Sequence, residues 1–217
     1  MNEPTAPSRP VRLKRGRPKP EAVAQMEEAV LATALQLFLD GGVDAVSMER
    51  VALMAGISRT TLYKRYATSA ELVDAMVQRT IATWYERTSD VPSIVSDDIE
   101  ALLQDRLAVI ANILIDPVFA ALQRFLLTTS GRFPHLASTM HEYGYQDAIR
   151  LLASDIRTVS ARIGQPVTCP ENVAEHIITS VHGWHIQHAM VRNLEAEDIQ
   201  TYGKSVIKLL LAARDQW

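Results

Sequence analysis

The stretch VALMAGISRTTLYKRY, residues 51–66, decides the fold. Its pattern predicts two short helices joined by a tight turn. Gly56 stands where a Cβ would be strained, and Ile57 supplies an apolar residue that fixes the angle between the helices. Ser47 and Ser58 precede the two helices at the positions of N-caps. This spacing predicts a helix-turn-helix, which places its second helix in the major groove of DNA.

The outer face of the second helix carries hydrogen-bond donors and no acid. Leu62 is expected to point inward, together with Val51 and Ala52 of the first helix. The residues expected to contact DNA are Ser47, Ser58, Arg59, Thr60, Thr61, Tyr63, Lys64 and Arg65. On spacing alone, an ordinary pair of helices with a solvated polar face remains an alternative.

The rest of the chain has a helical period throughout and no strand-period segment of useful length, so an all-α fold of about nine helices is expected. The capping box Thr68–Glu71 opens a longer helix, and Gly144 is a possible weak point in another. The expected helices run over residues 21–41, 47–56, 58–65, 68–88, 96–114, 117–130, 135–163, 171–193 and 199–214.

Composition excludes several other classes of protein. The chain has 217 residues, 47% of them apolar and 22% charged, as in an ordinary globular protein. Its single cysteine, Cys169, rules out a disulfide framework. The sequence shows neither an uninterrupted apolar run of about 18 residues nor an apolar secretory signal. We therefore expect a cytoplasmic protein with no membrane partner.

Charge is concentrated at the N-terminus. Residues 1–20 carry a net charge of +5 and half of the ten prolines, whereas the remaining residues carry −8. Such a segment cannot bury a core, so a basic arm that is disordered when free is expected over residues 1–20. The arm suits a polyanionic partner, although a solubilising tail would have the same composition.

Residues 51–66 resemble the signature of the TetR/AcrR family of bacterial transcriptional regulators. Residues 34–38 and Gly41-Gly42 resemble the first helix of that family, so the strong resemblance covers about residues 27–75. It implies a DNA-binding domain over residues 21–67, and a C-terminal domain over residues 68–217 that binds a ligand and dimerises. The protein would bind double-stranded DNA as a homodimer.

The resemblance also assigns roles within the motif. Thr61 and Tyr63 match positions that grip phosphates, whereas Arg59, Thr60 and Lys64 match positions that face base edges. Two positions depart from the family pattern: Tyr66 replaces the usual phenylalanine, and Ser69 replaces the usual lysine. Without that lysine, fewer ionic contacts with DNA are expected from the domain itself.

The arm offers a compensating contact. Residues 14–19, KRGRPK, resemble an AT-hook, whose Arg-Gly-Arg-Pro core lies in a narrow A·T-rich minor groove. We therefore expect Arg15 and Arg17 to contact DNA beside the helix-turn-helix, an arrangement that homeodomains also use.

The family's dimer interface is made by its last two helices, which pair with their copies. Both helices here carry wide apolar stripes, which also suit core packing within one chain. The expected interface residues are Ile177, Val181, Trp184, His188, Tyr202, Val206 and Leu209.

A ligand pocket is likewise implied by the family. Its lining is expected from Trp84, Leu107, Phe119, Phe125, Met140, Tyr143 and Trp184. Few charges fall among these residues, which favours a small apolar or amphipathic effector of unknown identity. Binding would shift the dimer toward a state with lower DNA affinity, with the helix over residues 68–88 as the lever.

Other functions have less support. His182, His185 and His188 spread over about 120° of helix surface, so they cannot converge on one ion, and neither a metal nor a cofactor is expected. The sequence holds none of the common catalytic motifs, so an enzyme is not expected. The preferred function is a ligand-responsive repressor on a (pseudo)palindromic operator. The alternative is an architectural DNA binder led by the basic arm.

Overall fold

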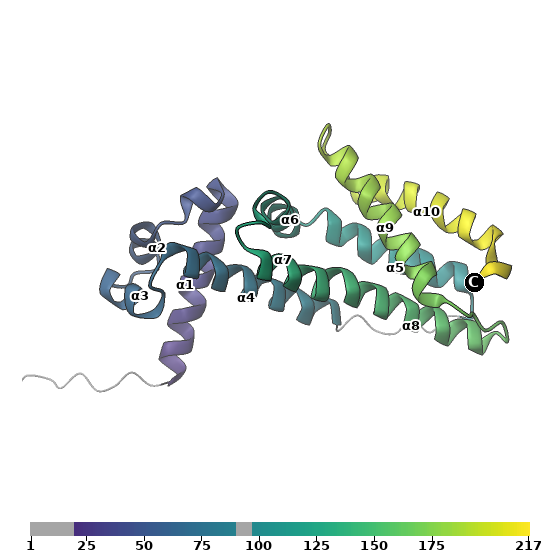
Figure 1. The fold of residues 1–217 in the computed structure, drawn as a ribbon, viewed down its shortest axis with the longest axis horizontal. Coiled ribbons are helices and arrows are strands. Elements are labelled where there is room, and N and C mark those ends of the chain that lie inside the picture. Colours follow the sequence, from purple (N-terminus) through teal and green to yellow (C-terminus); the bar gives the residue numbers. More distant parts are fainter. Residues whose placement is uncertain (1–19, 90–96) are drawn as a thin grey trace, which may run out of the picture.

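The computed structural model describes residues 20–89 and 97–217, and this part of the chain is helical with no strand. The predicted all-α architecture is confirmed (Figure 1). The helices are α1 (Pro20–Gly41), α2 (Met48–Met54), α3 (Arg59–Arg65), α4 (Ser69–Ser89), α5 (Ile99–Leu114), α6 (Pro117–Thr129), α7 (Pro134–Met140), α8 (Asp147–Arg162), α9 (Pro170–Ala189) and α10 (Ala196–Ala212). Three-residue 3-10 turns, Val43–Ala45 and Arg214–Gln216, follow α1 and α10.

The first three helices form a small domain around α1. Val30, Ala34, Leu37 and Phe38 of α1 are buried, as the sequence period predicted. The turn between α2 and α3 is built as expected, because Gly56 has a φ of 67°.

The two predicted N-caps are also present. The Ser47 hydroxyl accepts a hydrogen bond from the Arg50 amide at 3.3 Å. The Ser58 hydroxyl accepts one from the Thr61 amide at 3.0 Å. These bonds satisfy amides that a helix start leaves without an intrahelical partner, and they fix where each short helix begins.

Helix α4 begins close to the predicted residue and connects the two halves of the molecule (Figure 1). The Thr68 hydroxyl accepts from the Glu71 amide at 3.2 Å. The Glu71 carboxylate accepts from the amide of Ala67, at 2.8 Å, whereas the capping-box pattern predicted the amide of Thr68. The hydrogen bond of the Glu71 carboxylate is thus made to an amide one residue earlier than predicted. Both side chains of the predicted capping box still accept backbone amides at the start of α4.

The remaining helices form a longer, elongated half around a second core. Helices α5, α8, α9 and α10 supply most of that core, and Trp217 closes one end of it. Helices α9 and α10 run side by side along one edge of this half (Figure 1). Helix α9 ends at Ala189, four residues earlier than the pattern predicted.

The predicted long helix over residues 135–163 is divided in two. Residues His141–Gln146 form a π-helical turn between α7 and α8, and Gly144 lies inside it. Glycine weakens a helix because its backbone has more freedom to lose, and π-turns appear as single interruptions of longer helices. The weak point predicted at Gly144 therefore coincides with the interruption, which also raises the helix number above the expected nine.

The two halves share a continuous apolar junction. Phe125 of α6 packs edge-on against Phe38 of α1, with the ring centroids 5.5 Å apart, and it also contacts Phe133. Leu122, Leu126 and Leu136 belong to the same buried cluster as the helices of the first domain. One buried cluster thus spans both halves, and the predicted domain division after residue 67 stays a prediction.

Among the described helices, α1 is the one that is by itself long and apolar enough to cross a membrane. The sequence did not indicate this, because the apolar residues of α1 are interrupted by polar ones. Its contacts give another role: Leu37 and Phe38 are buried in the domain core, while Glu27 and Glu28 pair with Arg65 and Arg79 of α3 and α4. These contacts make α1 the central helix of a folded domain.

Candidate DNA interface and effector cavity

Helix α3 presents a polar face to solvent at one end of the molecule (Figure 1). Leu62 is 1% exposed and anchors the helix to the core, whereas Thr60, Tyr63 and Lys64 are exposed. Arg59 is also exposed, and its guanidinium lies 3.8 Å from the carboxylate of the exposed Glu49. An exposed pair this long contributes little, so Arg59 remains available to a DNA base or phosphate.

Arg65 was predicted as a DNA contact, and the structure gives it a different partner. Its Nε donates to the Glu27 carboxylate of α1 at 3.2 Å, and the Tyr66 hydroxyl donates to the same carboxylate at 3.3 Å. The Arg65 hydrogen bond is the main reason that the pKa of Glu27 is lowered. Arg65 therefore joins α3 to α1, and its contact with DNA stays a prediction. Nothing in the single helix indicated this pairing, because Glu27 lies 38 residues away.

The other predicted DNA residues divide into two groups. Ser47 and Ser58 cap α2 and α3, and the half-buried Thr61 places its hydroxyl 2.8 Å from that of Ser58. Arg15 and Arg17, with the rest of the AT-hook-like arm, lie outside the described residues.

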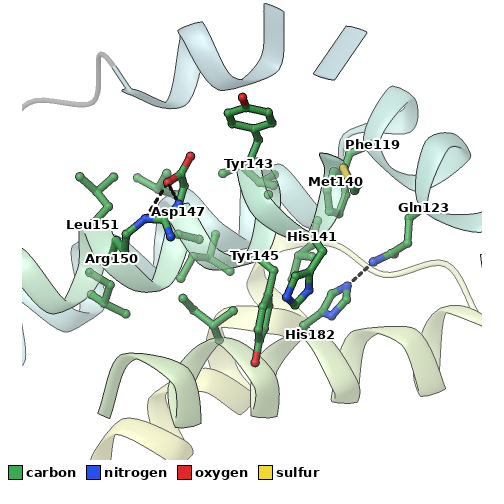
Figure 2. Close-up of a pocket in the computed structure, with 18 of the residues that line it drawn as sticks. Phe119, Gln123, Met140, His141, Tyr143, Tyr145, Asp147, Arg150, Leu151 and His182 are labelled. Atoms are coloured by element: carbon green, nitrogen blue, oxygen red, sulfur yellow. Dashed lines mark hydrogen bonds and ion pairs between the residues drawn. The ribbon is translucent and has the colours of Figure 1, made fainter. Parts of the chain in front are cut away.

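A second feature of the chain is a cavity of about 930 Å³ in the C-terminal half. Helices α5, α6, α7, α8 and α9 and the π-turn surround it (Figure 2). Its size lies near the upper end of the range for small-molecule pockets. Most of its wall is apolar, with Ile110, Ile113, Leu127, Leu151 and Ile178 among the lining residues.

Three of the predicted pocket residues line this cavity: Phe119, Met140 and Tyr143. Leu107 does not, because it is fully buried in the second core. Phe125 belongs to the junction with the DNA-binding domain, and Trp184 stacks on Tyr202 outside the cavity. Trp84 lies in α4, and its side chain falls outside the described residues.

Sequence reasoning missed the polar residues of the wall. Arg106 of α5 donates from Nε to Asp155 of α8 at 2.7 Å, and their side chains are 6% and 11% exposed. Arg150, another lining residue, pairs with Asp147 and with Glu142. Arg106 and Asp155 gave no sign in the sequence because they lie 49 residues apart on different helices. Asp147 and Arg150 stand three residues apart on α8, a spacing that could have indicated their pairing.

Gln123 of α6 and His182 of α9 face each other on the cavity wall and are hydrogen-bonded (Figure 2). Burial lowers the pKa of His182, and the nearby His185 adds to the effect. At neutral pH, His182 is therefore a neutral imidazole. The pair forms an uncharged donor and acceptor site in a mainly apolar cavity.

The comparisons with known proteins agree with the helix-turn-helix geometry. Residues 30–76 match the family model described as "Bacterial regulatory proteins, tetR family". A 69-residue segment is 36% identical to the DNA-binding transcriptional repressor TetR of Mycobacteroides abscessus, over 32% of this chain and 36% of that protein. The chain spans about a third of the length of the curated relatives it matches.

The DNA-binding domain therefore belongs to the TetR family. The fold agrees over nearly the whole length. A TetR-family structure from Mesorhizobium loti has a TM-score of 0.75 at 21% identity, over 88% of this chain and 96% of that one. The Flavonoid-responsive Regulator FrrA has a TM-score of 0.67 at 26% identity, over 88% of this chain and 97% of that one.

The residues predicted for a dimer interface fall on two sides of α9 and α10. Ile177 and Val181 are 1% and 0% exposed and belong to the chain's own core, so the structure removes them from a free surface. The outer side holds Trp184, half-buried, and Leu209, 73% exposed. Periodicity identified the apolar positions, but it could not separate these two sides.

The outer side of the two helices is ordered by ring stacking. Trp184 stacks on His188 with centroids 4.1 Å apart, and on Tyr202 of α10 at 5.0 Å. Val206, four residues after Tyr202, is half-buried, and Val191 is 80% exposed. That this apolar face forms the dimer interface stays a prediction.

The histidines of α9 have separate environments. His185 is buried, and its Nδ1 has no hydrogen-bond partner within the described part of the chain, whereas His188 bonds to the Trp184 carbonyl at 2.8 Å. Among the described residues, no three His, Cys, Asp or Glu side chains gather where they could hold a metal ion.

The buried histidines predict how stability depends on pH. Burial lowers the pKa of both His182 and His185 below the ordinary value of 6.5. As pH falls through 6.5, the unfolded chain takes up protons before the folded one does, so stability present at higher pH is lost. Each histidine lowers the free energy of unfolding by at most about 1.4 kcal/mol for each unit by which the pH falls.

Thermal unfolding at pH 7.5, 6.5 and 5.5 measures this dependence. The melting temperature should fall over this range, and the fall should be smaller in the double variant His182→Gln/His185→Leu. The control His176→Gln changes an exposed histidine on the same helix and should keep the wild-type profile. Equal slopes for the wild type and the double variant would show that other groups cause the dependence.

Proposed function

We propose that the protein is a ligand-responsive transcriptional repressor. It binds a (pseudo)palindromic operator as a homodimer and is released by a small apolar or amphipathic effector. The protein acts in the bacterial cytoplasm on nucleoid DNA and catalyses no reaction. The observation that carries the proposal is the union in one chain of a TetR-family DNA-binding domain and a large, mostly apolar cavity.

Helix α4 provides the physical connection between the two sites. It is joined to α1 of the DNA-binding domain by Arg79 and Glu28, at 2.9 Å, and to α7 by a hydrogen bond between Asp74 and His135. It also packs against the π-turn, which lines the cavity with His141, Tyr143, Gly144 and Tyr145. An effector that alters the π-turn therefore acts on an element that touches α4.

Dimerisation follows from the geometry of DNA recognition. Two recognition helices must reach successive major grooves about one duplex turn apart, which a symmetric dimer provides. The outer apolar face of α9 and α10, with Trp184, Tyr202 and Leu209, supplies the surface for this pairing. The comparison with FrrA, whose name states that it responds to a flavonoid, supports a small-molecule effector for the same fold.

The test is fluorescence anisotropy with DNA from the protein's own upstream region and a scrambled duplex of equal composition. We expect a preference of about a thousandfold for the native DNA at physiological salt. Lys64→Ala should weaken native binding by about tenfold or more and reduce the preference, since Lys64 is expected at a base edge. The matched control Lys208→Ala removes an exposed lysine of α10, far from α3 in sequence, and should bind as the wild type does.

Deletion of residues 1–19 distinguishes the repressor from an architectural binder. A repressor should lose affinity but keep its preference for the native duplex, because the helix-turn-helix reads the bases. A binder led by the arm should lose all DNA binding, and the intact protein should bind both duplexes equally with a steep salt dependence. That second pattern would contradict the proposed function.

A further inference from the structure

The polar groups of the cavity indicate which chemical class of effector it accepts. Among the described residues that line it, the permanently charged side chains are Arg106, Asp147 and Arg150. Arg106 is paired with Asp155, and Arg150 is paired with Asp147 and Glu142. An ionic ligand beside Arg106 would have to break a buried pair or remain uncompensated in an apolar space, and both are unfavourable. The Arg150 pairs are more exposed and contribute less to this selection.

The Gln123–His182 pair offers a different type of contact. A primary amide has two N–H donors and a carbonyl acceptor, so one N–H can bond to His182 Nε2 while the carbonyl and the second N–H remain for a ligand. Figure 2 shows this pair at one end of the cavity, with Asp147 and Arg150 toward the other end. The pair is uncharged, and its two residues lie on different helices, α6 and α9.

The cavity wall is rich in rings. Phe119 and Tyr143 line the cavity, and His141 stacks on Tyr145 with centroids 5.3 Å apart and planes at 27°. Flat ring systems bury large apolar areas against such side chains in stacked or edge-on arrangements. The cavity volume of about 930 Å³ gives room for a molecule of two or three rings.

We propose that the effector is a neutral aromatic molecule of two or three rings, whose hydroxyl or carbonyl oxygen bonds to the Gln123–His182 pair. The proposal rests on the function proposed above, since it names the ligand class of the same cavity. Carboxylates and ammonium compounds of similar size are rejected because the charges on the wall are already paired. Gln123 thereby determines specificity through a hydrogen bond to the ligand.

Three probes on one scaffold test the proposal without any variant: 4-hydroxystilbene, stilbene-4-carboxylate and 4-(aminomethyl)stilbene. Isothermal titration calorimetry of the full chain at pH 7.5 should give an affinity for the hydroxyl compound at least about tenfold higher than for either ionic compound, because an unpaired buried charge costs more than a lost neutral hydrogen bond. Equal or tighter binding of an ionic probe would overturn the proposal.

Variants then locate the contact. Gln123→Leu keeps the approximate side-chain volume and removes the hydrogen-bonding groups. It should lower the affinity for 4-hydroxystilbene about tenfold and reduce the ratio of that affinity to the affinity for 4-methylstilbene. The matched control Gln104→Leu changes a glutamine of α5 outside the cavity lining and should leave both affinities unchanged. A Gln123→Leu protein that is folded by circular dichroism and binds both probes as the wild type does would contradict the role of Gln123.

Operator binding, measured in the same preparations, separates this proposal from the proposed function. If the protein selects its operator but does not bind 4-hydroxystilbene, the ligand class is wrong and the regulator stands. If it prefers 4-hydroxystilbene but the probe leaves DNA affinity unchanged, the ligand class stands and the effector mechanism is wrong. The result that supports both is release of DNA by 4-hydroxystilbene in the wild type and in Gln104→Leu, and weaker release in Gln123→Leu.

Discussion

Replacing Arg106 with methionine should destabilise the protein by about 3–5 kcal/mol, because it leaves the Asp155 carboxylate buried without its partner. The two side chains are 6% and 11% exposed and are joined at 2.7 Å, so little water can replace the guanidinium. Thermal and urea unfolding of Arg106→Met measure the loss. On the scale of a protein of this size, the melting temperature should fall by on the order of 10 °C.

A double variant separates the value of the ion pair from the cost of breaking it. In Arg106→Met/Asp155→Leu both charges are replaced by apolar side chains of similar size, and stability should return close to that of the wild type. The control is Arg157→Met. Arg157 lies on α8, as Asp155 does, and forms an exposed ion pair with Glu171 of α9, so its loss should change the melting temperature very little. A double variant as unstable as Arg106→Met alone would show that Arg106 acts mainly through packing.

This ion pair also bears on the cavity. Arg106 lines it, so the double variant would convert a paired, buried charge into an apolar wall without adding a free charge. Binding of a neutral aromatic probe should then survive in the double variant. The same probe would lose its site in Arg106→Met only to the extent that the C-terminal half unfolds.

Local chemistry was enough to predict the DNA-binding half. Gly56, Ser58 and the capping residue Thr68 each act within a few residues of their own position, and each is found in its predicted role. Arg65 shows the limit of this reasoning. Its partner Glu27 lies on another helix, and only the packing of α1 against α3 brings the two together.

The cavity was harder to predict. Periodicity shows which side of a helix is apolar, but it does not show whether that side packs in a core or lines a cavity. Leu107, Phe125 and Phe119 all occupy apolar stripes, yet the first lies in a core, the second at the domain junction and the third on the cavity wall. Gln123 and His182 are 59 residues apart in the sequence. Their meeting depends on how α6 and α9 are placed in space.

The same limit explains the dimer residues. Ile177 and Val181 stand one helical turn apart, and Trp184 and His188 follow them in the same apolar run along α9. A wide stripe of this kind covers both a face toward the chain's own core and a face toward solvent. The packing of α9 against α8 and α10 buries Ile177 and Val181 within one chain.

Gly203 was not identified from the sequence, although an isolated glycine inside a helix often marks a close approach. It is buried in α10, where a Cβ would lie 2.7 Å from Leu107 Cδ2 and 3.0 Å from Leu107 Cγ, and closer still to Cδ1. Leu107 of α5 is itself 0% exposed, so its side chain has no free space into which to move. The two helices can pack this closely only because residue 203 has no side chain.

Gly203→Ala should therefore destabilise the protein by about 3 kcal/mol, the upper end of the usual cost of overpacking, even though alanine favours a helix by up to about 1 kcal/mol over glycine. The matched control Gly144→Ala places a Cβ at ordinary contact distance, 3.6 Å from Met140 Sδ, so it should show no overpacking penalty. Urea unfolding gives both values.

Shortening Leu107 tests whether this single contact is responsible. Leu107→Ala alone should cost about 2–5 kcal/mol because it leaves a cavity in the core. In Leu107→Ala/Gly203→Ala, the new methyl group enters the space that the leucine left, so the double variant should be more stable than the sum of the two single losses predicts, by about 1–3 kcal/mol. Strict additivity would show that the penalty at residue 203 comes from the helix itself and not from the approach of α5 to α10.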